Sequence, residues 1–201
     1  MLLGKRPPVP TCILLTRPID SCGRLHATSL DDKLNVWNFL SFGRPFRLVT
    51  PLLDGATRDS TPVQVESAWS FSSVLTKGGD VFVWWPLHGE MKQLIDARNA
   101  AMDEEGLHAH ATERGIIQCA HWDLPHDPYR LPELPRLPKL DETKAEDIVY
   151  LVKIAALDSH LIGLTNYGHV VKILVQTIDT ARLEGWVYVR RFLPRCSHFL
   201  C

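Results

Sequence analysis

The chain has 201 residues, which is enough for one domain with a sizeable core. Apolar residues make up 45% and charged residues 22%, a composition that excludes a disordered chain. The 22 basic and 23 acidic residues leave a formal net charge of −1, so the chain lacks the broad basic field needed for nonspecific binding to nucleic acid or anionic membranes. We therefore expect no nucleic-acid partner and no membrane partner.

Five cysteines, at positions 12, 22, 119, 196 and 201, form an odd set without a C-x-x-C pair. Such a set fits reduced thiols better than a disulfide framework. The longest aliphatic run near the start, residues 12–15, is far shorter than a secretory leader or a membrane span. These features predict a cytoplasmic or nuclear protein.

The first elements in chain order are short strands. Residues 25–39 form a weak hairpin pattern around Asp31-Asp32-Lys33, and residues 63–66 alternate apolar and polar side chains. Residues 72–85 predict a stronger hairpin, because a turn signal at 77–80 separates a β-rich run from the aromatic run that ends at Trp84-Trp85. Trp37, Trp84 and Trp85 fall inside strand patterns and are expected in the core.

The middle of the chain has a different pattern. Met91, Leu94, Ile95, Ala101 and Met102 fall at helical spacing, and Gly106 suits a C-cap, so about 89–105 is predicted as an amphipathic helix. Between residues 124 and 140, proline recurs every third or fourth position, which favours an extended course outside a sheet ladder. We interpret the two together as an insertion, with the Pro-rich part a strap over the rim of the fold or a partner site.

The last predicted hairpin runs from residue 160 to 173, with its turn at Asn166-Tyr167-Gly168. Residues 177–201 do not extend this pattern and are interpreted as an atypical C-terminal segment, either a new strand or a non-native end. The predicted domain boundaries are an N-terminal segment at 1–18, blade-like repeats at 19–86, the insertion at 87–146, a further repeat at 147–176, and the segment 177–201.

The strand-rich segments resemble one another. Residues 63–84 align without a gap on 152–173, 89 positions later, with six identities in 22 positions. Moving the same unit back by 45 positions places Leu75 on Leu30 and Val81-Phe82 on Val36-Trp37. A period of about 45–50 residues with several strands per unit is typical of β-propeller blades. The predicted fold class is therefore all-β, a partial β-propeller with about three recognisable repeats plus the helical and Pro-rich insertion.

Residues 64–84 and 153–165 are similar to repeats of the regulator-of-chromosome-condensation type, which read roughly V-x-V-A-A-G-x-x-H-x-L-A-L-T-x-D-G-x-V-Y-x-W-G. Ala68 and Leu157 replace the usual glycine, Phe71 replaces the histidine that His160 keeps, and Leu34 stands at the turn glycine of the first unit. Seven blades of this size would need roughly 350 residues, so the chain is expected to hold only part of a propeller.

Residues 36–48 and 83–86, with Asp123-Leu124 and Arg130-Leu131-Pro132, narrow the resemblance to fungal F-box proteins of the SCF-associated-factor type. In that family an F-box binds the Skp-type linker of a cullin-RING ubiquitin ligase, and the propeller captures a protein substrate. No F-box pattern is present in these residues, so linker and cullin are expected only through a longer parent chain. The alternatives are a guanine-nucleotide exchange factor for a small GTPase and a non-catalytic scaffold.

Four residues are candidates for partner binding. Trp69 and Asp158 occupy the same place in two repeats, at the link between two strands, where propeller loops reach a binding face. Trp69 offers an aromatic anchor among small neighbours, and the alternative is that it packs between blades. Arg44 and Arg47 flank Pro45 and could meet an acidic substrate or be merely solvated.

Catalytic and metal signals are weak. Imidazole and thiolate ligands suit zinc, and His108, His110, Cys119 and His121 are the candidates, but their spacing matches no standard zinc motif. The chain has no Gly-x-Ser-x-Gly elbow, no His-Glu-x-x-His and no Walker loop. We expect no catalytic residues, no metal, no cofactor and no enzymatic activity.

Overall fold

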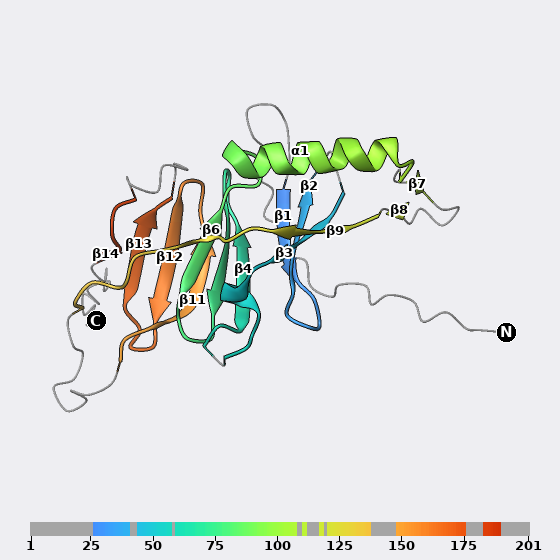
Figure 1. Ribbon diagram of the computed structural model, residues 1–201. Helices are drawn as coiled ribbons and strands as arrows, with labels where there is room; N and C mark the ends of the chain where they lie inside the picture. The colour runs from blue at the N-terminus through green and yellow to red at the C-terminus, as the bar shows by residue number, and fades with distance from the viewer. Residues whose placement is uncertain are drawn as a thin grey trace, which may run out of the picture.

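The computed structural model describes residues 26–40, 44–57, 59–107, 110–111, 117–118, 120–137, 148–175 and 183–189. Three four-stranded sheets stand side by side, and one helix lies along one end of the first two (Figure 1). The fold is a partial β-propeller, as the repeats predicted, and we number its sheets blade 1 to blade 3 in chain order. No helix in the described ranges is long and apolar enough to cross a membrane.

Each blade is built around one of the predicted hairpins. Blade 1 contains β1 (His26–Leu30), β2 (Val36–Leu40), β3 (Phe46–Val49) and β9 (Trp122–Pro125). Blade 2 contains β4 (Pro62–Ser67), β5 (Ser72–Thr76), β6 (Val81–Trp84) and β10 (Tyr129–Arg130). Blade 3 contains β11 (Leu151–Ala156), β12 (His160–Thr165), β13 (Val170–Leu174) and β14 (Val187–Tyr188). Neighbouring strands are antiparallel except β3 and β9, which are parallel. A short 3-10 helix, η1 (Pro51–Leu53), follows β3, and β7 (His110–Ala111) pairs with β8 (Ile117–Gln118).

The three hairpin turns share one hydrogen-bond pattern. The amide of the first turn residue donates to the carbonyl four positions later, from Asp31 to Asn35, from Thr76 to Asp80 and from Thr165 to His169. The fourth residue takes a left-handed backbone in every blade, with φ of 63° at Leu34, 91° at Gly79 and 77° at Gly168. The hairpins therefore superpose in the registers of 45 and 89 residues that the sequence indicated.

The predicted insertion contains helix α1 (Gly89–Glu104), close to the expected bounds. Gly106 ends it with φ of 74°, and the amide of Leu107 donates to the carbonyl of Met102, the bond of a Schellman cap. Met91, Ile95 and Met102 are buried, whereas Leu94, expected on the same face, is 42% exposed.

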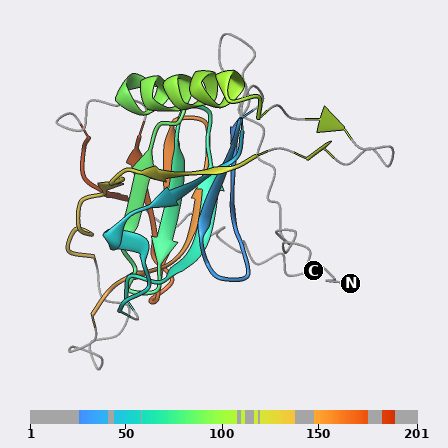
Figure 2. The same ribbon diagram turned by 45° about the vertical axis from the view of Figure 1, so that its right-hand side comes forward.

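The Pro-rich segment differs from the prediction of a strap outside the sheets. Its β9 adds to the outer edge of blade 1 and its β10 adds to the outer edge of blade 2, so it joins the two blades (Figures 1 and 2). Pro125 is tolerated because β9 lies at an edge, where one side of the strand needs no donors. The segment 177–201 likewise supplies β14 to blade 3.

The core lies between the blades in two clusters. One cluster joins blades 1 and 2 and the buried face of α1, and includes Phe46, Trp84 and Ile95. The other joins blades 2 and 3 and includes Leu75, Leu161 and Ile173. Blade 2 is thus buried on both faces, while blades 1 and 3 each have one face on which no other blade of the described residues packs.

Candidate partner-binding surface

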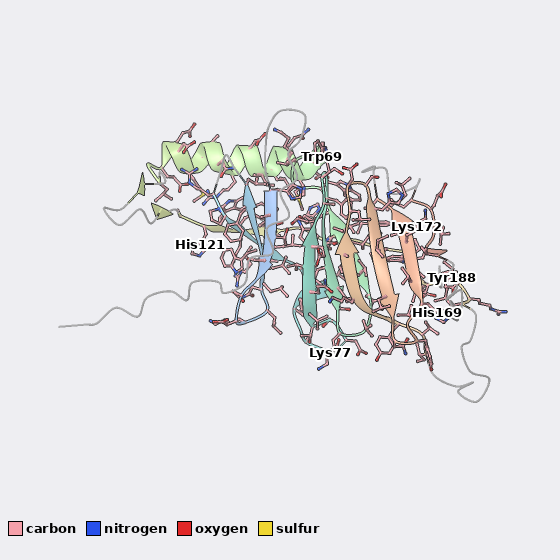
Figure 3. The ribbon with its side chains drawn as sticks, turned by 180° about the vertical axis from the view of Figure 1, so that it is seen from behind. Trp69, Lys77, His121, His169, Lys172 and Tyr188 are labelled. Carbon is pink, nitrogen blue, oxygen red and sulfur yellow. The ribbon has the colours of Figure 1, made fainter. Side chains whose placement is uncertain are left out.

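The links between the first two strands of blades 2 and 3 emerge at the end of the sheets where α1 lies (Figure 3). Trp69 is 47% exposed there, Leu157 is 56% exposed, and Asp158 is exposed. The backbone amide of Trp69 donates to the carbonyl of Asp158 over 3.3 Å, so the two links are in contact. We call these three residues the Trp69 surface.

The two links that form this surface have the same tight-turn hydrogen bond. The amide of Ala68 donates to the carbonyl of Phe71, and the amide of Leu157 donates to that of His160, both over 2.8 Å. In blade 2, Ala68 and Phe71 are buried beneath the link, which leaves Trp69 at its tip. At 47% exposure the Trp69 side chain is not enclosed between the blades, and its role in partner binding stays a prediction.

The sequence interpretation missed Leu157 as a surface residue and noted it only as a departure from the repeat glycine. A bulky apolar residue at that link position, beside the tip residue Asp158, was the available signal. Together the surface offers an exposed indole, an aliphatic side chain and a carboxylate. This combination suits an apolar side chain of a partner with a basic group close to it.

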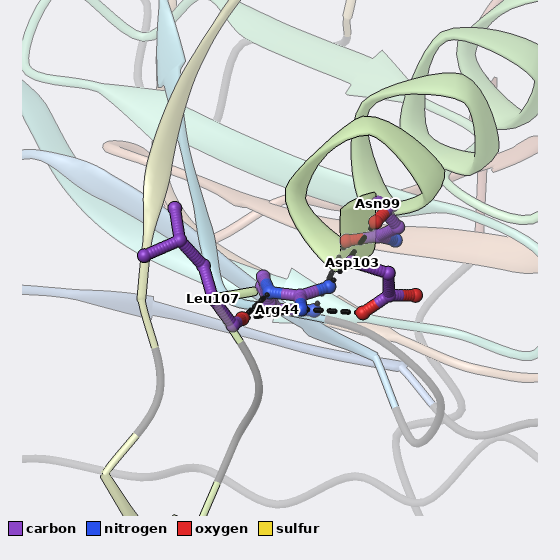
Figure 4. Close-up of polar contacts among 4 residues, drawn as sticks. All are labelled: Arg44, Asn99, Asp103 and Leu107. Atoms are coloured by element: carbon purple, nitrogen blue, oxygen red, sulfur yellow. Dashed lines mark hydrogen bonds and ion pairs between the residues drawn. The ribbon is translucent and has the colours of Figure 1, made fainter. Parts of the chain in front are cut away.

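Arg44 does not face a partner. It is 5% exposed and its guanidinium caps the C-terminal end of α1 (Figure 4). Its Nη2 lies 2.6 Å from Asp103, its Nε donates to the carbonyl of Leu107 over 2.7 Å, and its Nη1 donates to that of Asn99 over 3.3 Å. A cation at this helix end also complements the helix dipole. The structure corrects the prediction for Arg44, which has a structural role.

Arg47 lies on the outer part of blade 1 and is paired within the chain. It forms two bonds with Asp123, its partner in the β3–β9 register, of 2.9 Å from Nε and 2.5 Å from Nη2. The bond to Asp123 raises the pKa of Arg47, burial opposes this, and the charge of Asp31 adds to the increase. The Arg47 side chain is 35% exposed, so it is in contact with solvent while it links β3 to β9.

Asp31, in the hairpin turn of blade 1, accepts hydrogen bonds from two side chains and two backbone amides. Burial acts to raise the pKa of Asp31. Hydrogen bonds from the side chains of Trp37 and Asn35 and from the backbone amides of Asn35 and Lys33 outweigh burial. The pKa of Asp31 therefore lies below its ordinary value of 3.8. The Trp37 Nε1–Oδ2 distance is 2.9 Å. Trp37 is accordingly half-buried, whereas Trp84 and Trp85 are buried as predicted.

The structure leaves the zinc prediction untested as a set, because it does not describe all four candidates. His108 and Cys119 lie outside the described residues, and His110 is described only as part of β7. His121 is exposed and its ring packs edge-on against Trp37, with centroids 5.2 Å apart. Within the described ranges no group of three His, Cys, Asp or Glu side chains could hold a metal ion.

Two cavities lie apart from the Trp69 surface. One of about 340 Å³ lies between blades 2 and 3, beside the Gly78-Gly79 turn, and is lined in part by Arg130, Tyr150 and Trp186. The other, of about 320 Å³, is bordered by η1, the residues that follow it and Arg130. Neither cavity contains Trp69, Asp158, Arg44 or Arg47.

No protein-family profile matches the sequence, and no curated protein matches it. Among solved structures, human WBSCR16 is similar over 83% of this chain and 37% of its own, with 16% identity and a TM-score of 0.42. Prp20p from Saccharomyces cerevisiae is similar over 78% of this chain and 33% of its own, with 15% identity and a TM-score of 0.38. Yeast RCC1 (Prp20) in its complex with Kap60 is similar over 74% of this chain and 30% of its own, with 12% identity and a TM-score of 0.38.

The chain thus spans about a third of the length of these solved structures. One of the three is named RCC1, after the repeat type that the sequence resembles, and none of the three bears on the F-box part of the resemblance. Prp20p itself has binding properties toward Gsp1p and histones. Sequence identities and TM-scores this low carry no argument. The partial propeller is therefore assigned from the three blades and their repeated turns.

Proposed function

We propose that the chain is a protein-interaction propeller and forms part of the substrate-recognition half of an F-box ubiquitin-ligase adaptor. The observation that carries the proposal is Trp69, a large aromatic side chain 47% exposed at the tip of a tight link. Exposed aromatic anchors are typical centres of protein interfaces. The sequence resemblance of residues 36–48 and 83–86 supplies the adaptor class.

In this proposal the chain performs no chemistry. The propeller would hold a protein substrate by the Trp69 surface, and ubiquitin transfer would belong to the ligase partners, so the contribution of the propeller is proximity. The Skp-type linker and the cullin would bind through the F-box of a longer parent chain. The near-neutral charge supports a protein substrate over nucleic acid.

The direct test compares Trp69→Ala with Leu52→Ala in the parent chain. Leu52 is 40% exposed in η1, away from the Trp69 surface, so it controls for the loss of exposed apolar area. We expect Trp69→Ala to keep the melting temperature, to lose captured substrate and to lengthen that substrate's half-life in cells. Trp69 does not belong to the binding site if Trp69→Ala keeps the melting temperature and changes neither the capture of the substrate nor the half-life of the substrate.

The adaptor class has its own test. Residues 1–201 should fail to retain the Skp-type linker in a pull-down, whereas the parent chain with its F-box should retain it. Linker binding by residues 1–201 would contradict this assignment. Release of nucleotide from a small GTPase by the purified parent would replace the adaptor proposal with the exchange-factor alternative.

A further inference from the structure

Two cavities adjoin the hairpin turn of blade 2, at the end of the sheets opposite the Trp69 surface. Figure 3 shows Lys77, which belongs to this turn, at the opposite end of the sheets from Trp69. The larger cavity, of about 340 Å³, lies between blades 2 and 3, and the smaller, of about 320 Å³, lies between blade 2 and the segment that starts with η1. Asp80 and Arg130 border both cavities. The two cavities are therefore neighbours that share one wall.

The shared wall contains an ion pair. Arg130 of β10 donates two hydrogen bonds to one carboxylate oxygen of Asp80, over 3.2 Å from Nε and 2.6 Å from Nη2. The side chain of Arg130 is 58% exposed and that of Asp80 is 41% exposed. Because the two charges neutralise each other, this pair adds no net charge to either cavity.

Two glycines of the turn allow the other walls to come close. A Cβ atom on Gly78 would lie 2.9 Å from the Cβ of Asp59, which lines the smaller cavity. A Cβ atom on Gly79 would lie 2.8 Å from the Cβ of Tyr150, which lines the larger cavity. The amide of Gly78 also donates to the carbonyl of Asp59 over 3.1 Å. The close approach that glycine permits thus sets the position of one lining residue in each cavity.

The larger cavity combines aromatic walls with a carboxylate. Tyr150 is 39% exposed, and the buried Trp186 is held by a bond of 3.0 Å from its Nε1 to the carbonyl of Pro132. Glu133 is exposed and forms no ion pair within the described ranges. This lining can accept a cation, since aromatic faces and a free carboxylate both attract one.

The smaller cavity has the same chemistry. Asp54 and Asp59 are exposed on its loop side, and Phe82 of β6 supplies an aromatic wall. Arg58, which precedes Asp59 in the sequence, lies outside the described residues. The described residues that line the two cavities together include four carboxylates and one guanidinium. A chain with a formal net charge of −1 therefore concentrates negative charge around these cavities.

We propose that the two cavities form one site for an extended segment of a partner protein that carries two arginines, one for each cavity. A guanidinium binds carboxylates through paired hydrogen bonds and stacks on aromatic rings, which the ammonium of lysine does not do as well. The alkyl stem of an arginine can lie along an apolar wall while its charged head reaches a carboxylate. The inference is independent of the proposed function, because this site and the Trp69 surface lie at opposite ends of the sheets.

The test is fluorescence anisotropy of labelled tetra-arginine titrated with the chain, with tetra-lysine alongside. We expect saturable binding of tetra-arginine that weakens as salt is raised, and weaker binding of tetra-lysine. Glu133→Gln, Asp59→Asn and Tyr150→Ala should each weaken the binding of tetra-arginine by about two- to fivefold. Glu104→Gln removes an exposed carboxylate of α1, outside both cavities, and should leave the affinity unchanged. Circular dichroism and melting temperature show that each variant is folded.

Arg130→Gln provides a second test that a loss of folding cannot imitate. This change removes the cation that lines both cavities and frees Asp80, so tetra-arginine should bind about two- to fivefold more tightly. Arg136→Gln removes an exposed cation outside both cavities and should leave the affinity unchanged. Weaker binding by Arg130→Gln would overturn the proposal, as would equal losses in Glu133→Gln and Glu104→Gln. Equal affinity for tetra-arginine and tetra-lysine, or no binding of tetra-arginine, would also overturn it.

Discussion

The two contacts between blades use different chemistry. Between blades 2 and 3 lies an apolar cluster, and Gln64 of β4 exchanges two hydrogen bonds with the backbone of Ile154. Ser73 and Glu66 are also buried on this face of blade 2. Between blades 1 and 2 a buried hydroxyl network lies beside the apolar cluster. Thr28 donates to Ser72 over 2.7 Å and accepts from Ser67 over 3.1 Å.

The contrast is sharpest at equivalent positions. Asn38 and Trp84 meet across blades 1 and 2, where the indole Nε1 donates to the amide oxygen over 2.9 Å. The equivalents of this pair, 45 and 89 positions later, are Val83 and Ile173, which belong to the apolar cluster between blades 2 and 3. The same positions in successive blades can therefore hold either a hydrogen-bonded pair of side chains or two aliphatic side chains.

The polar contact is also the one that the insertion reinforces. Met91 and Ile95 of α1 pack into the cluster between blades 1 and 2, and β9 and β10 join the outer edges of the two blades. Buried hydrogen bonds contribute little net stability but cost much when one partner is lost. The difference teaches that blades 2 and 3 are held mainly by apolar burial, whereas blades 1 and 2 are held by matched polar groups and a covering helix.

The largest expected effect is at the apolar contact. Ile173→Ala should lower the free energy of unfolding by about 2–5 kcal/mol, because Ile173 is 1% exposed and its loss leaves a cavity. Leu174→Ala is the matched control, since the next residue of β13 is 37% exposed. Urea unfolding measures both. Equal losses for the two variants would show that apolar burial does not hold this contact.

The polar contact should respond less and in a non-additive way. Trp84→Phe removes the donor to Asn38 inside the core and should cost about 1–3 kcal/mol. Adding Asn38→Val recreates the apolar chemistry of Val83 and should recover part of that loss. A double-mutant cycle by urea unfolding measures the coupling, and strictly additive losses would show that the Asn38–Trp84 bond contributes nothing.

Acid should weaken blade 1 through Asp31. The pKa of this carboxylate is lower in the folded chain than its ordinary value of 3.8, so the folded state is stabilised above that value and loses this stabilisation as pH falls through the folded pKa. Stability measured from neutral pH down through this range should fall less steeply in Asp31→Asn than in the wild type. Identical pH profiles for the two proteins would contradict this contribution.

The smallest effect concerns the turn of blade 1. Leu34 has φ of 63°, where blades 2 and 3 have glycine, and a left-handed backbone costs a side chain about 1–2 kcal/mol. Leu34→Gly should therefore raise stability by up to about 1 kcal/mol, after the entropic cost of glycine is subtracted. Lys33→Gly, beside it at negative φ, should instead lower the melting temperature. A loss in both variants would mean that Leu34 has contacts worth more than its strain.

The candidate site was only partly predictable. The exposure of Trp69 and Asp158 was predictable because the repeat placed them at equivalent links, and links between propeller strands lie at the ends of the blades. Arg44 was misjudged because the carbonyls that it binds belong to Asn99 and Leu107, more than 50 positions later. Leu157 was missed because its exposure depends on whether a blade packs beside it, which no local pattern indicates.

Periodicity and repetition in the sequence alone determined the blades, their hairpins and the helix, because these depend on local alternation of side chains and on glycine at one turn position. Only the tertiary structure decided which distant segments complete each sheet. The Pro-rich stretch became β9 and β10, and residues 187–188 became β14, because an edge strand needs backbone partners and hardly any sequence pattern of its own. The tertiary structure also decided which repeat faces are covered, since burial depends on the neighbour and equivalent residues such as Leu75 and Leu164 differ in that alone.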